Sequence, residues 1–322
     1  MSCFGAQMKL VPGPASAISW LSLRGGRSQS AGHRVGLMKS ARTRAALREA
    51  RSALEAPVGF VPTMGALHEG HASLVRRARD ECQSVVASIF VNPMQFGPNE
   101  DFSRYPRDEA ADLEMLERLG VDVAFVPGVE EIYPPGHTTS VDVGRLGDGL
   151  EGAARPGHFR GVATVVSIMF SLVRPDRAYF GQKDGQQSVV IKRMVRDLGM
   201  PVDIVVCPTV RESDGLALAS RNRYLTTEER AQAPILNRAL QAAAGAHAEG
   251  ERSAERLREL MRSQLVQATV GTTDYVSVAD ADSLEELSSV DRPALASLAV
   301  RFPSARLIDC LPLDVQGRAV PT

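Results

Sequence analysis

The stretch Val58-Gly-Phe-Val-Pro-Thr-Met-Gly-Ala-Leu-His-Glu-Gly-His71 decides how this chain folds. Val58–Val61 is a short apolar run that predicts a buried strand, which Pro62 should end because proline has no N–H for a ladder. Gly65 and Gly70 then permit tight backbone turns. A strand that turns through glycines onto a helix N-terminus is suited to holding phosphate, because the first helical N–H groups are unpaired and the helix dipole is positive there.

Two histidines lie where this strand would meet its helix. His71 opens Ala72–Cys82, in which apolar residues recur at helical spacing. His68 and His71 can donate hydrogen bonds as charge develops on phosphate oxygens. They can equally be a turn histidine and a polar residue at the helix start, which is the more common fate of such a pair. Zinc is less favoured, because the order His-Glu-x-His is not the His-Glu-x-x-His of metalloproteases.

Composition predicts a globular protein that binds neither nucleic acid nor membrane. The chain has 322 residues, 44% of them hydrophobic, and a net charge of -1, enough for two domains but without the basic excess of a nucleic-acid-binding face. No apolar run is long enough to span a bilayer. The four cysteines form no Cys-x-x-Cys pair, so we expect a cytoplasmic protein in which Cys82 and Cys207 are buried apolar residues.

The N-terminal segment has an unusual composition. Residues 1–48 contain no acidic residue but several arginines and lysines. Such a segment can be an organelle-targeting peptide, a disordered tail, or the product of a start site upstream of the natural one, for which Met38 is a candidate. We interpret residues 1–37 as a disordered extension without function.

The middle of the chain alternates strands with helices. Beyond the first strand, the expected strands are Ser84–Val91, Val121–Val126, Asp176–Phe180 and Val202–Val206, and the expected helices are Ser40–Leu54, Arg107–Leu119, Gly161–Val173 and Asp184–Leu198. Gly128–His137 is expected as loop, and Thr138–Val143 alternates like an outer strand. The alternation predicts an α/β fold, with a Rossmann-like parallel sheet over residues 38–209 and ligands at the carboxyl ends of its strands.

The amino-acid composition changes after Pro208. Long Ala-, Arg- and Glu-rich segments predict helices over Thr226–Ala248 and Arg252–Thr269. Short strands are expected at Asp274–Val278, Ala296–Val300 and Arg306–Ile308. Residues 210–322 should therefore form a smaller α+β domain.

Three further segments carry polar groups suited to a site. Asn92 and Gln95 offer amides to a small polar ligand, although Asn92-Pro93 can simply make a turn. Lys183 can supply a mobile charge to phosphates, whereas Asp184 followed by Gln187 is also a capping-box pattern that would only start a helix. The third segment carries Arg155, His158 and Arg160. These side chains can be solvated loop residues, or they can hold the carboxylate of a ligand.

Pro62-Thr-Met-Gly-Ala-Leu-His-Glu-Gly-His71 resembles the signature of the pantoate–β-alanine ligases (pantothenate synthetases), a variant of the HxGH motif of adenylylating nucleotidyltransferases. Five motifs match in the family's order between about Met38 and Leu313. The resemblance implies that ATP and pantoate give pantoyl adenylate and pyrophosphate, and that β-alanine then gives pantothenate and AMP. It also implies Mg²⁺ bound mainly through ATP phosphates, with no protein metal site, and a homodimer formed through the larger domain.

The resemblance also assigns roles to individual residues. The catalytic positions are His68, His71 (the family's proton donor) and Lys183. Gln95 and Gln187 would bind pantoate or β-alanine with Asn92 close by, Tyr105 would line the site mouth, and Arg155–Gly161 would lie beside the pocket. The ATP-binding positions are Met64, Gly65, Ala66, Leu67, His68, Glu69, Gly70, His71, Gly181, Gln182, Lys183, Asp184, Val210, Leu218, Ala219, Ser220 and Arg221.

Three positions depart from the family pattern: Gly185, Leu218 and Ala219. Gly185 stands where an aromatic residue is expected, which should loosen the pocket wall. Leu218-Ala219-Ser220-Arg221 stands for Met-Ser-Ser-Arg, the counterpart of the KMSKS loop of aminoacyl-tRNA synthetases. Ala219 removes one potential phosphate hydrogen bond, worth about 0.5–1.5 kcal/mol. Two alternatives stay open. One is another HxGH nucleotidyltransferase, against which the Asn92-Pro-Met-Gln95 segment speaks, and the other is a non-catalytic nucleotide-binding protein, for which Gly185 and Ala219 are the only indications.

Overall fold

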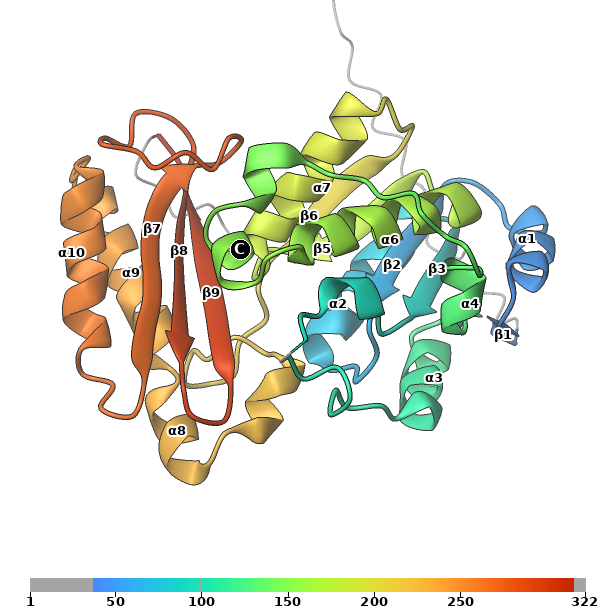
Figure 1. Ribbon diagram of the computed structural model, residues 1–322, viewed down its shortest axis with the longest axis horizontal. Coiled ribbons are helices and arrows are strands. Elements are labelled where there is room, and N and C mark those ends of the chain that lie inside the picture. Colours follow the sequence, from blue (N-terminus) through green and yellow to red (C-terminus); the bar gives the residue numbers. More distant parts are fainter. Residues whose placement is uncertain (1–36, 99, 316–322) are drawn as a thin grey trace, which may run out of the picture. The chain divides into compact units, whose positions relative to one another are not determined.

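The computed structural model describes residues 37–98 and 100–315. The extension expected over residues 1–37 lies, except for Leu37, outside the described residues. A sheet of six strands has the order β1-β4-β3-β2-β5-β6, and all of its ladders are parallel (Figure 1). This confirms the Rossmann-like sheet. Its strands are β1 (Lys39–Ala41), β2 (Val58–Thr63), β3 (Ser84–Ile89), β4 (Val123–Phe125), β5 (Arg177–Gly181) and β6 (Asp203–Cys207).

Helices cover both faces of this sheet. Phe60 and Phe125 on one face share a buried apolar cluster with residues of α1, α6 and α7. Val61 and Val85 on the other face share a second cluster with residues of α2 and α3. A parallel sheet buried on both faces explains why its strands read as continuous apolar runs. The bounds of these helices are α1 (Arg44–Ser52), α2 (Glu69–Glu81), α3 (Glu109–Arg118), α6 (His158–Val173) and α7 (Gly185–Asp197).

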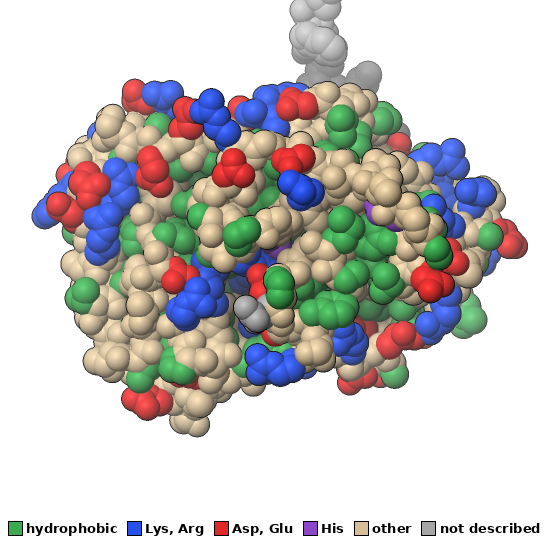
Figure 2. Space-filling model, in the orientation of Figure 1, with side chains coloured by type: hydrophobic (Ala, Val, Ile, Leu, Met, Phe, Trp, Pro, Cys, Tyr) green, Lys and Arg blue, Asp and Glu red, His purple; other side chains and the backbone are tan. Residues whose placement is uncertain are grey.

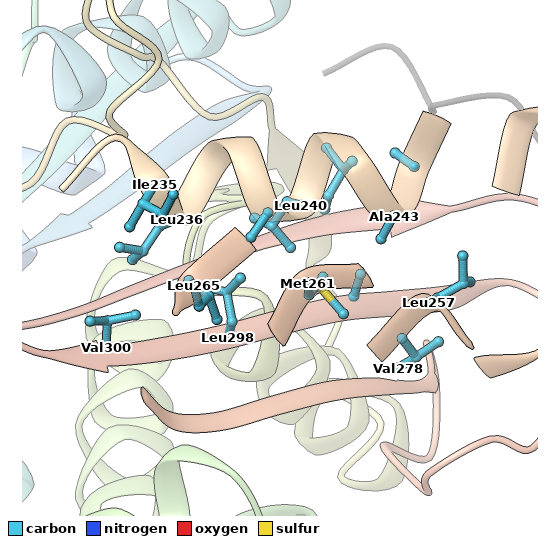
Figure 3. Packing of buried hydrophobic residues seen from close by; sticks show 14 of the residues in the cluster. Ile235, Leu236, Leu240, Ala243, Leu257, Met261, Leu265, Val278, Leu298 and Val300 are labelled. Carbon is cyan, nitrogen blue, oxygen red and sulfur yellow. The ribbon is translucent and has the colours of Figure 1, made fainter. Parts of the chain in front are cut away.

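The C-terminal part forms the expected smaller α+β layer. Three antiparallel strands, β7 (Thr272–Asp280), β8 (Ala294–Arg301) and β9 (Arg306–Leu313), are covered on one face by α9 (Ile235–Ala248) and α10 (Ala254–Leu265). Figure 3 shows Leu240, Met261 and Leu298 in the core between them. The other face of the sheet turns toward the start of α7, and Cys310 Sγ lies 2.8 Å from the carbonyl oxygen of Gln182 in the turn before that helix.

Two expected elements differ in the structure. Thr138–Val143 forms no strand. Instead, the N–H of Val141 donates to Thr164 Oγ1 at 2.9 Å, so the segment packs on α6 without a strand partner. The single helix expected over Thr226–Ala248 is broken into α8 (Thr227–Gln232) and α9, because Pro234 has no N–H to continue the first helix.

The start and end of other elements also differ. Lys39–Ala41 pairs with β4 as an edge strand, and the helix expected from Ser40 begins only at Arg44, after its cap Thr43. β2 continues through Pro62 to Thr63, since Pro62 pairs only with β3 beyond the end of the β5 ladder. Short helical turns occupy other connections: η1 (Pro93–Gln95), α4 (Val129–Ile132) within the expected loop, η2 (Gly144–Gly147), α5 (Glu151–Ala154) and η3 (Ser220–Tyr224).

The strand order determines where a ligand would lie. β2 sits between β3 and β5, and the chain order reverses at this point. In such sheets ligands lie outside the carboxyl ends of the strands where the order reverses. The loops after β2, β3 and β5 therefore meet at one edge. None of the helices in the described part of the chain is long and apolar enough to cross a lipid bilayer.

Candidate active site

A cavity of about 950 Å³ opens at the carboxyl edge of the parallel sheet. Its wall includes His68 and His71 at the start of α2, Lys183 after β5, and Gln187 on α7. Four groups from two separate motifs therefore face one space. On the face of the molecule drawn in Figure 2, Lys and Arg side chains lie beside Asp and Glu side chains around the middle.

Backbone contacts at the start of α2 orient both imidazoles. The N–H of Gly70 donates to His68 Nδ1 at 3.1 Å, and the N–H of His68 donates to His71 Nδ1 at 3.3 Å. A neutral imidazole has one acceptor nitrogen and one N–H. Each ring therefore carries its proton on Nε2 and can offer that group to a ligand. Gly70 is required here, because a Cβ at this position would lie 2.9 Å from the His68 ring.

Burial keeps both histidines neutral. It lowers the pKa of His68 to about 4, helped by the nearby charge of Lys183. It lowers the pKa of His71 to about 3, helped by His68. At neutral pH each side chain is thus a hydrogen-bond donor without a charge of its own.

The cationic group that follows β5, Lys183, is held by its neighbour in sequence. Lys183 Nζ lies 3.0 Å from Asp184 Oδ1. Burial works against the ammonium, but the charge and hydrogen bond of Asp184 outweigh it and raise the pKa of Lys183. Asp184 makes no side-chain cap on α7, so the capping-box interpretation of Asp184 and Gln187 is wrong. Gln187 lies on the cavity wall instead.

The amide loop after β3 is ordered from within. Asn92 is 1% exposed, and its Nδ2 donates to Gln95 Oε1 at 3.0 Å and to the carbonyl oxygen of Gly161 at 3.1 Å. Its Oδ1 accepts from the hydroxyl of Tyr133 at 2.7 Å. The side-chain amide of Asn92 is therefore hydrogen-bonded to other groups of the protein. Through its bond to Gln95 Oε1, Asn92 orients the Gln95 side chain on the cavity wall.

The Arg155 segment places two of its three expected groups on the wall. Arg155 forms a two-bond pair with Glu100, at 2.9 and 2.6 Å. His158 Nδ1 lies 2.8 Å from the carbonyl oxygen of Gln95, and burial together with Arg155 lowers the pKa of His158 to about 4. Arg160 is exposed and pairs with Asp142 outside this cavity, as a solvated loop residue would.

The loop between the two sheets closes over the signature turn. The N–H of Leu218 donates to the carbonyl oxygen of Val210 at 2.9 Å. Ser220 Oγ donates to the carbonyl oxygen of Ala66 at 3.2 Å. The Arg221 guanidinium carbon lies 6.0 Å from the centre of the Tyr105 ring. Leu218, Ala219, Ser220 and Arg221 all line the cavity.

Five of the expected ATP-binding residues are not on the cavity wall. They are Gly65, Ala66, Leu67, Glu69 and Gln182. The N–H groups of Ala66 and Leu67 instead meet the buried carboxylate of Asp112. The other expected ATP-binding residues, Met64, His68, Gly70, His71, Gly181, Lys183, Asp184, Val210, Leu218, Ala219, Ser220 and Arg221, do line it.

Gly185 does not loosen the wall as expected. A Cβ at this position would lie 2.7 Å from Cys310 Sγ and 2.8 Å from Leu295 Cδ2. Side chains of β8 and β9 thus pack directly against the helix start. The C-terminal sheet fills the space that an aromatic ring would need.

Sequence reasoning missed the acidic partners of the site. Glu100, Asp101 and Glu151 line the cavity, and Glu151 holds Arg306 of β9 with contacts of 2.6 and 2.8 Å. Nothing in their sequence context separates them from surface acids. The described residues contain no group of three or more His, Cys, Asp or Glu placed to hold a metal ion.

The family model described as Pantoate-beta-alanine ligase matches residues 37–312. The chain belongs to the pantoate-beta-alanine ligase family. It is 57% identical over 282 residues to the pantothenate synthetase of Chloroflexus aurantiacus, covering 87% of this chain and 100% of that protein. As a member of this family, it is a ligase that joins pantoate to β-alanine.

Solved structures of this ligase family have the same fold. The pantothenate synthetase of Thermus thermophilus superposes with a TM-score of 0.81 at 52% identity, covering 85% of this chain and 99% of that one. The pantoate-beta-alanine ligase of Francisella tularensis, complexed with "Beta-gamma ATP and Beta-alanine", superposes with a TM-score of 0.70 at 35% identity, covering 85% and 97%.

Proposed function

We propose that this ligase condenses (R)-pantoate with β-alanine in two steps, using ATP and passing through a pantoyl adenylate. The observation that carries the proposal is the single cavity shared by His68, His71, Lys183, Gln95 and Gln187. The Francisella tularensis relative, complexed with "Beta-gamma ATP and Beta-alanine", supports ATP and β-alanine as substrates for this chain.

In the first step a pantoate carboxylate oxygen attacks the α-phosphorus of ATP. The bond from that phosphorus to the bridging oxygen breaks, and pyrophosphate leaves with the electron pair. Such a transfer depends on positioning and on charge stabilisation more than on covalent help from protein. His68 and His71 donate their Nε2–H groups to phosphate oxygens as negative charge grows. Lys183 and Arg221 hold the departing pyrophosphate, and Ser220 joins them once its hydroxyl leaves the carbonyl oxygen of Ala66.

The acyl substrates bind beside the amide loop. Gln95 and Gln187 donate to and accept from the hydroxyl and carboxyl groups of pantoate. Asn92 acts through Gln95, because its own amide is used on protein contacts. The Arg155 guanidinium is placed to attract a substrate carboxylate once its pair with Glu100 opens.

In the second step the β-alanine amine attacks the acyl carbon of the adenylate. A carbon–nitrogen bond forms, the carbon–oxygen bond to AMP breaks, and the proton of the amine passes to the leaving phosphate of AMP. Water must be kept from the acyl adenylate meanwhile. The loop from Val210 to Arg221 and the edge of the C-terminal sheet, which share the cavity wall, would exclude it.

Mg²⁺ would bind mainly to ATP in this scheme. Asp184 is the carboxylate beside Lys183, and no larger group of metal ligands occurs in residues 37–98 and 100–315. Mg²⁺ commonly binds phosphates with one or two carboxylates and several waters, so Asp184 fits it as a single ligand. When bound, the ion would neutralise phosphate charge. We also expect a cytoplasmic homodimer, formed through the parallel-sheet part.

A coupled assay tests the proposal directly. Purified enzyme with ATP, pantoate and β-alanine should release AMP in proportion to pantothenate, and omission of β-alanine should stop turnover. A nucleotidyl product without AMP would instead indicate another HxGH nucleotidyltransferase. Absence of any turnover, with ATP still bound, would indicate a nucleotide-binding protein.

A further inference from the structure

Asp112 is a buried carboxylate beneath the turn that joins β2 to α2. It lies on α3, is 4% exposed, and is not on the cavity wall. Its Oδ2 accepts the N–H of Ala66 at 2.9 Å, and its Oδ1 accepts the N–H of Leu67 at 2.7 Å. The two oxygens of this one carboxylate thus accept the N–H groups of two successive residues in the Pro62–His71 motif.

The backbone of that turn needs such a partner. Gly65 and Ala66 have φ of 81° and 51°, two consecutive left-handed residues. Left-handed residues within a turn point successive N–H groups into one concavity that suits an anion. Without the carboxylate, two buried N–H groups would lose their partner, which proteins rarely tolerate. Gly65 fits closely against Asp112, since a Cβ there would lie 2.8 Å from Oδ2.

The held turn leads directly into the two imidazoles. Leu67 precedes His68, whose ring caps α2 and whose N–H fixes His71 Nδ1. The carbonyl oxygen of Ala66 accepts the hydroxyl of Ser220, so the same turn also supports the loop between the sheets. A displacement of the turn would therefore move both Nε2–H groups and the Ser220 loop together.

We propose that Asp112 is a positioning residue for the adenylation step, which rests on the function proposed above. Its carboxylate holds the left-handed turn so that the two imidazoles meet the phosphates in one arrangement. It acts through His68 and His71 and touches no substrate. The alternative is that Asp112 only stabilises the fold.

The test compares Asp112→Asn with Asp122→Asn. Asn is isosteric with Asp but turns an NH₂ group toward one of the two N–H donors. Asp122 serves as the control, because its Oδ2 also accepts a backbone N–H, that of Val85 at 2.7 Å, together with Arg79 at 2.8 Å, but at the opposite, amino end of the strands. D112N should lower the rate of adenylate formation on the order of 10²-fold, as a displacement of about 1 Å does, with a much smaller change in ATP affinity. D122N should leave both values near those of wild type.

Nitrogen-15 NMR of the imidazoles gives a readout that fold stability alone does not move. In wild type and D122N, both rings should show the proton on Nε2, whereas in D112N the His68 and His71 signals should shift or broaden.

If D112N folds and keeps wild-type adenylation and wild-type imidazole signals, Asp112 is only structural and the proposal is overturned. If D112N does not fold, Gly65→Ala decides, since its methyl group must push the turn away from Asp112. Normal adenylation by a folded G65A would equally overturn the proposal. A wild-type enzyme without β-alanine-dependent AMP release would instead refute the proposed function.

Discussion

Arg221, which we assign to the departing pyrophosphate, is paired with Asp101. Its Nε lies 3.0 Å from Oδ2 and its Nη2 lies 2.8 Å from Oδ1. Asp101 is followed in the same loop by Tyr105, over which the guanidinium lies. This pair uses two of the five N–H groups of the guanidinium, so a phosphate anion would compete with the Asp101 carboxylate for Arg221.

Removing the competing carboxylate should strengthen phosphate binding. In Asp101→Asn the guanidinium no longer has an anionic partner, so the Kd for pyrophosphate should fall by about two- to fivefold, the range expected for a partly exposed ion pair. Isothermal titration calorimetry measures this. Glu109→Gln, which breaks the exposed pair of Glu109 with Arg42, is the matched control and should leave the Kd unchanged. Weaker pyrophosphate binding by D101N would contradict the assignment of Arg221.

The histidines predict a specific dependence of stability on pH. The pKa values of His68 and His71 are lowered from 6.5 to about 4 and about 3. Between pH 6.5 and 4 the unfolded chain therefore binds more protons than the folded one, so the free energy of unfolding falls as the pH falls through this window. Well above pH 6.5 both states are neutral at these positions, and the contribution is constant.

Urea unfolding at several pH values checks this dependence. The double variant His68→Gln, His71→Gln should lose part of the decline between pH 6.5 and 4 that the wild type shows. His137→Gln, a histidine outside the cavity, serves as control. An identical decline in the wild type and the double variant would show that the two imidazoles are not held neutral by the fold.

The close approach of Gly185 to the C-terminal sheet predicts an energetic coupling. Gly185→Ala places a Cβ 2.7 Å from Cys310 Sγ and 2.8 Å from Leu295 Cδ2, and such overpacking typically costs about 1–3 kcal/mol. Because part of the clash is with Sγ, the cost should be smaller in a Cys310→Ala background. Gly245→Ala, with no atom within 4 Å of its Cβ, should be tolerated. A double-mutant cycle built from the free energies of urea unfolding measures this coupling. Additive effects of the two substitutions would mean that Gly185 and Cys310 do not pack as described.

The elements that sequence predicted well depend on local pattern. The apolar runs from Val58 and Ser84 had to be strands, and the loops after them had to share an edge once the sheet was parallel. That argument brought His68 and Lys183 together from separate motifs. It failed for Thr138–Val143, whose alternation looks like a strand although no neighbouring strand is there to pair with it.

The acidic groups of the site could not be predicted in this way. Asp112 follows the helical pattern of α3 like any surface acid, and its burial arises only when α3 packs beneath the signature turn. Asp101 and Glu100 meet Arg221 and Arg155 across long sequence separations. Such pairs depend on tertiary contact, and no local spacing indicates them. The same holds for Gly185, whose departure is explained only by its tertiary contacts with Leu295 of β8 and Cys310 of β9.

His71 is the residue that we propose to stabilise the phosphates while the adenylate forms. Rapid-quench measurement of pyrophosphate release in a single turnover tests this role most directly, with His71→Ala compared with His137→Ala. We predict that H71A slows adenylate formation by about 10²- to 10⁴-fold while the Kd for ATP changes far less, and that H137A behaves like wild type. An unchanged rate of pyrophosphate release in H71A would contradict the account.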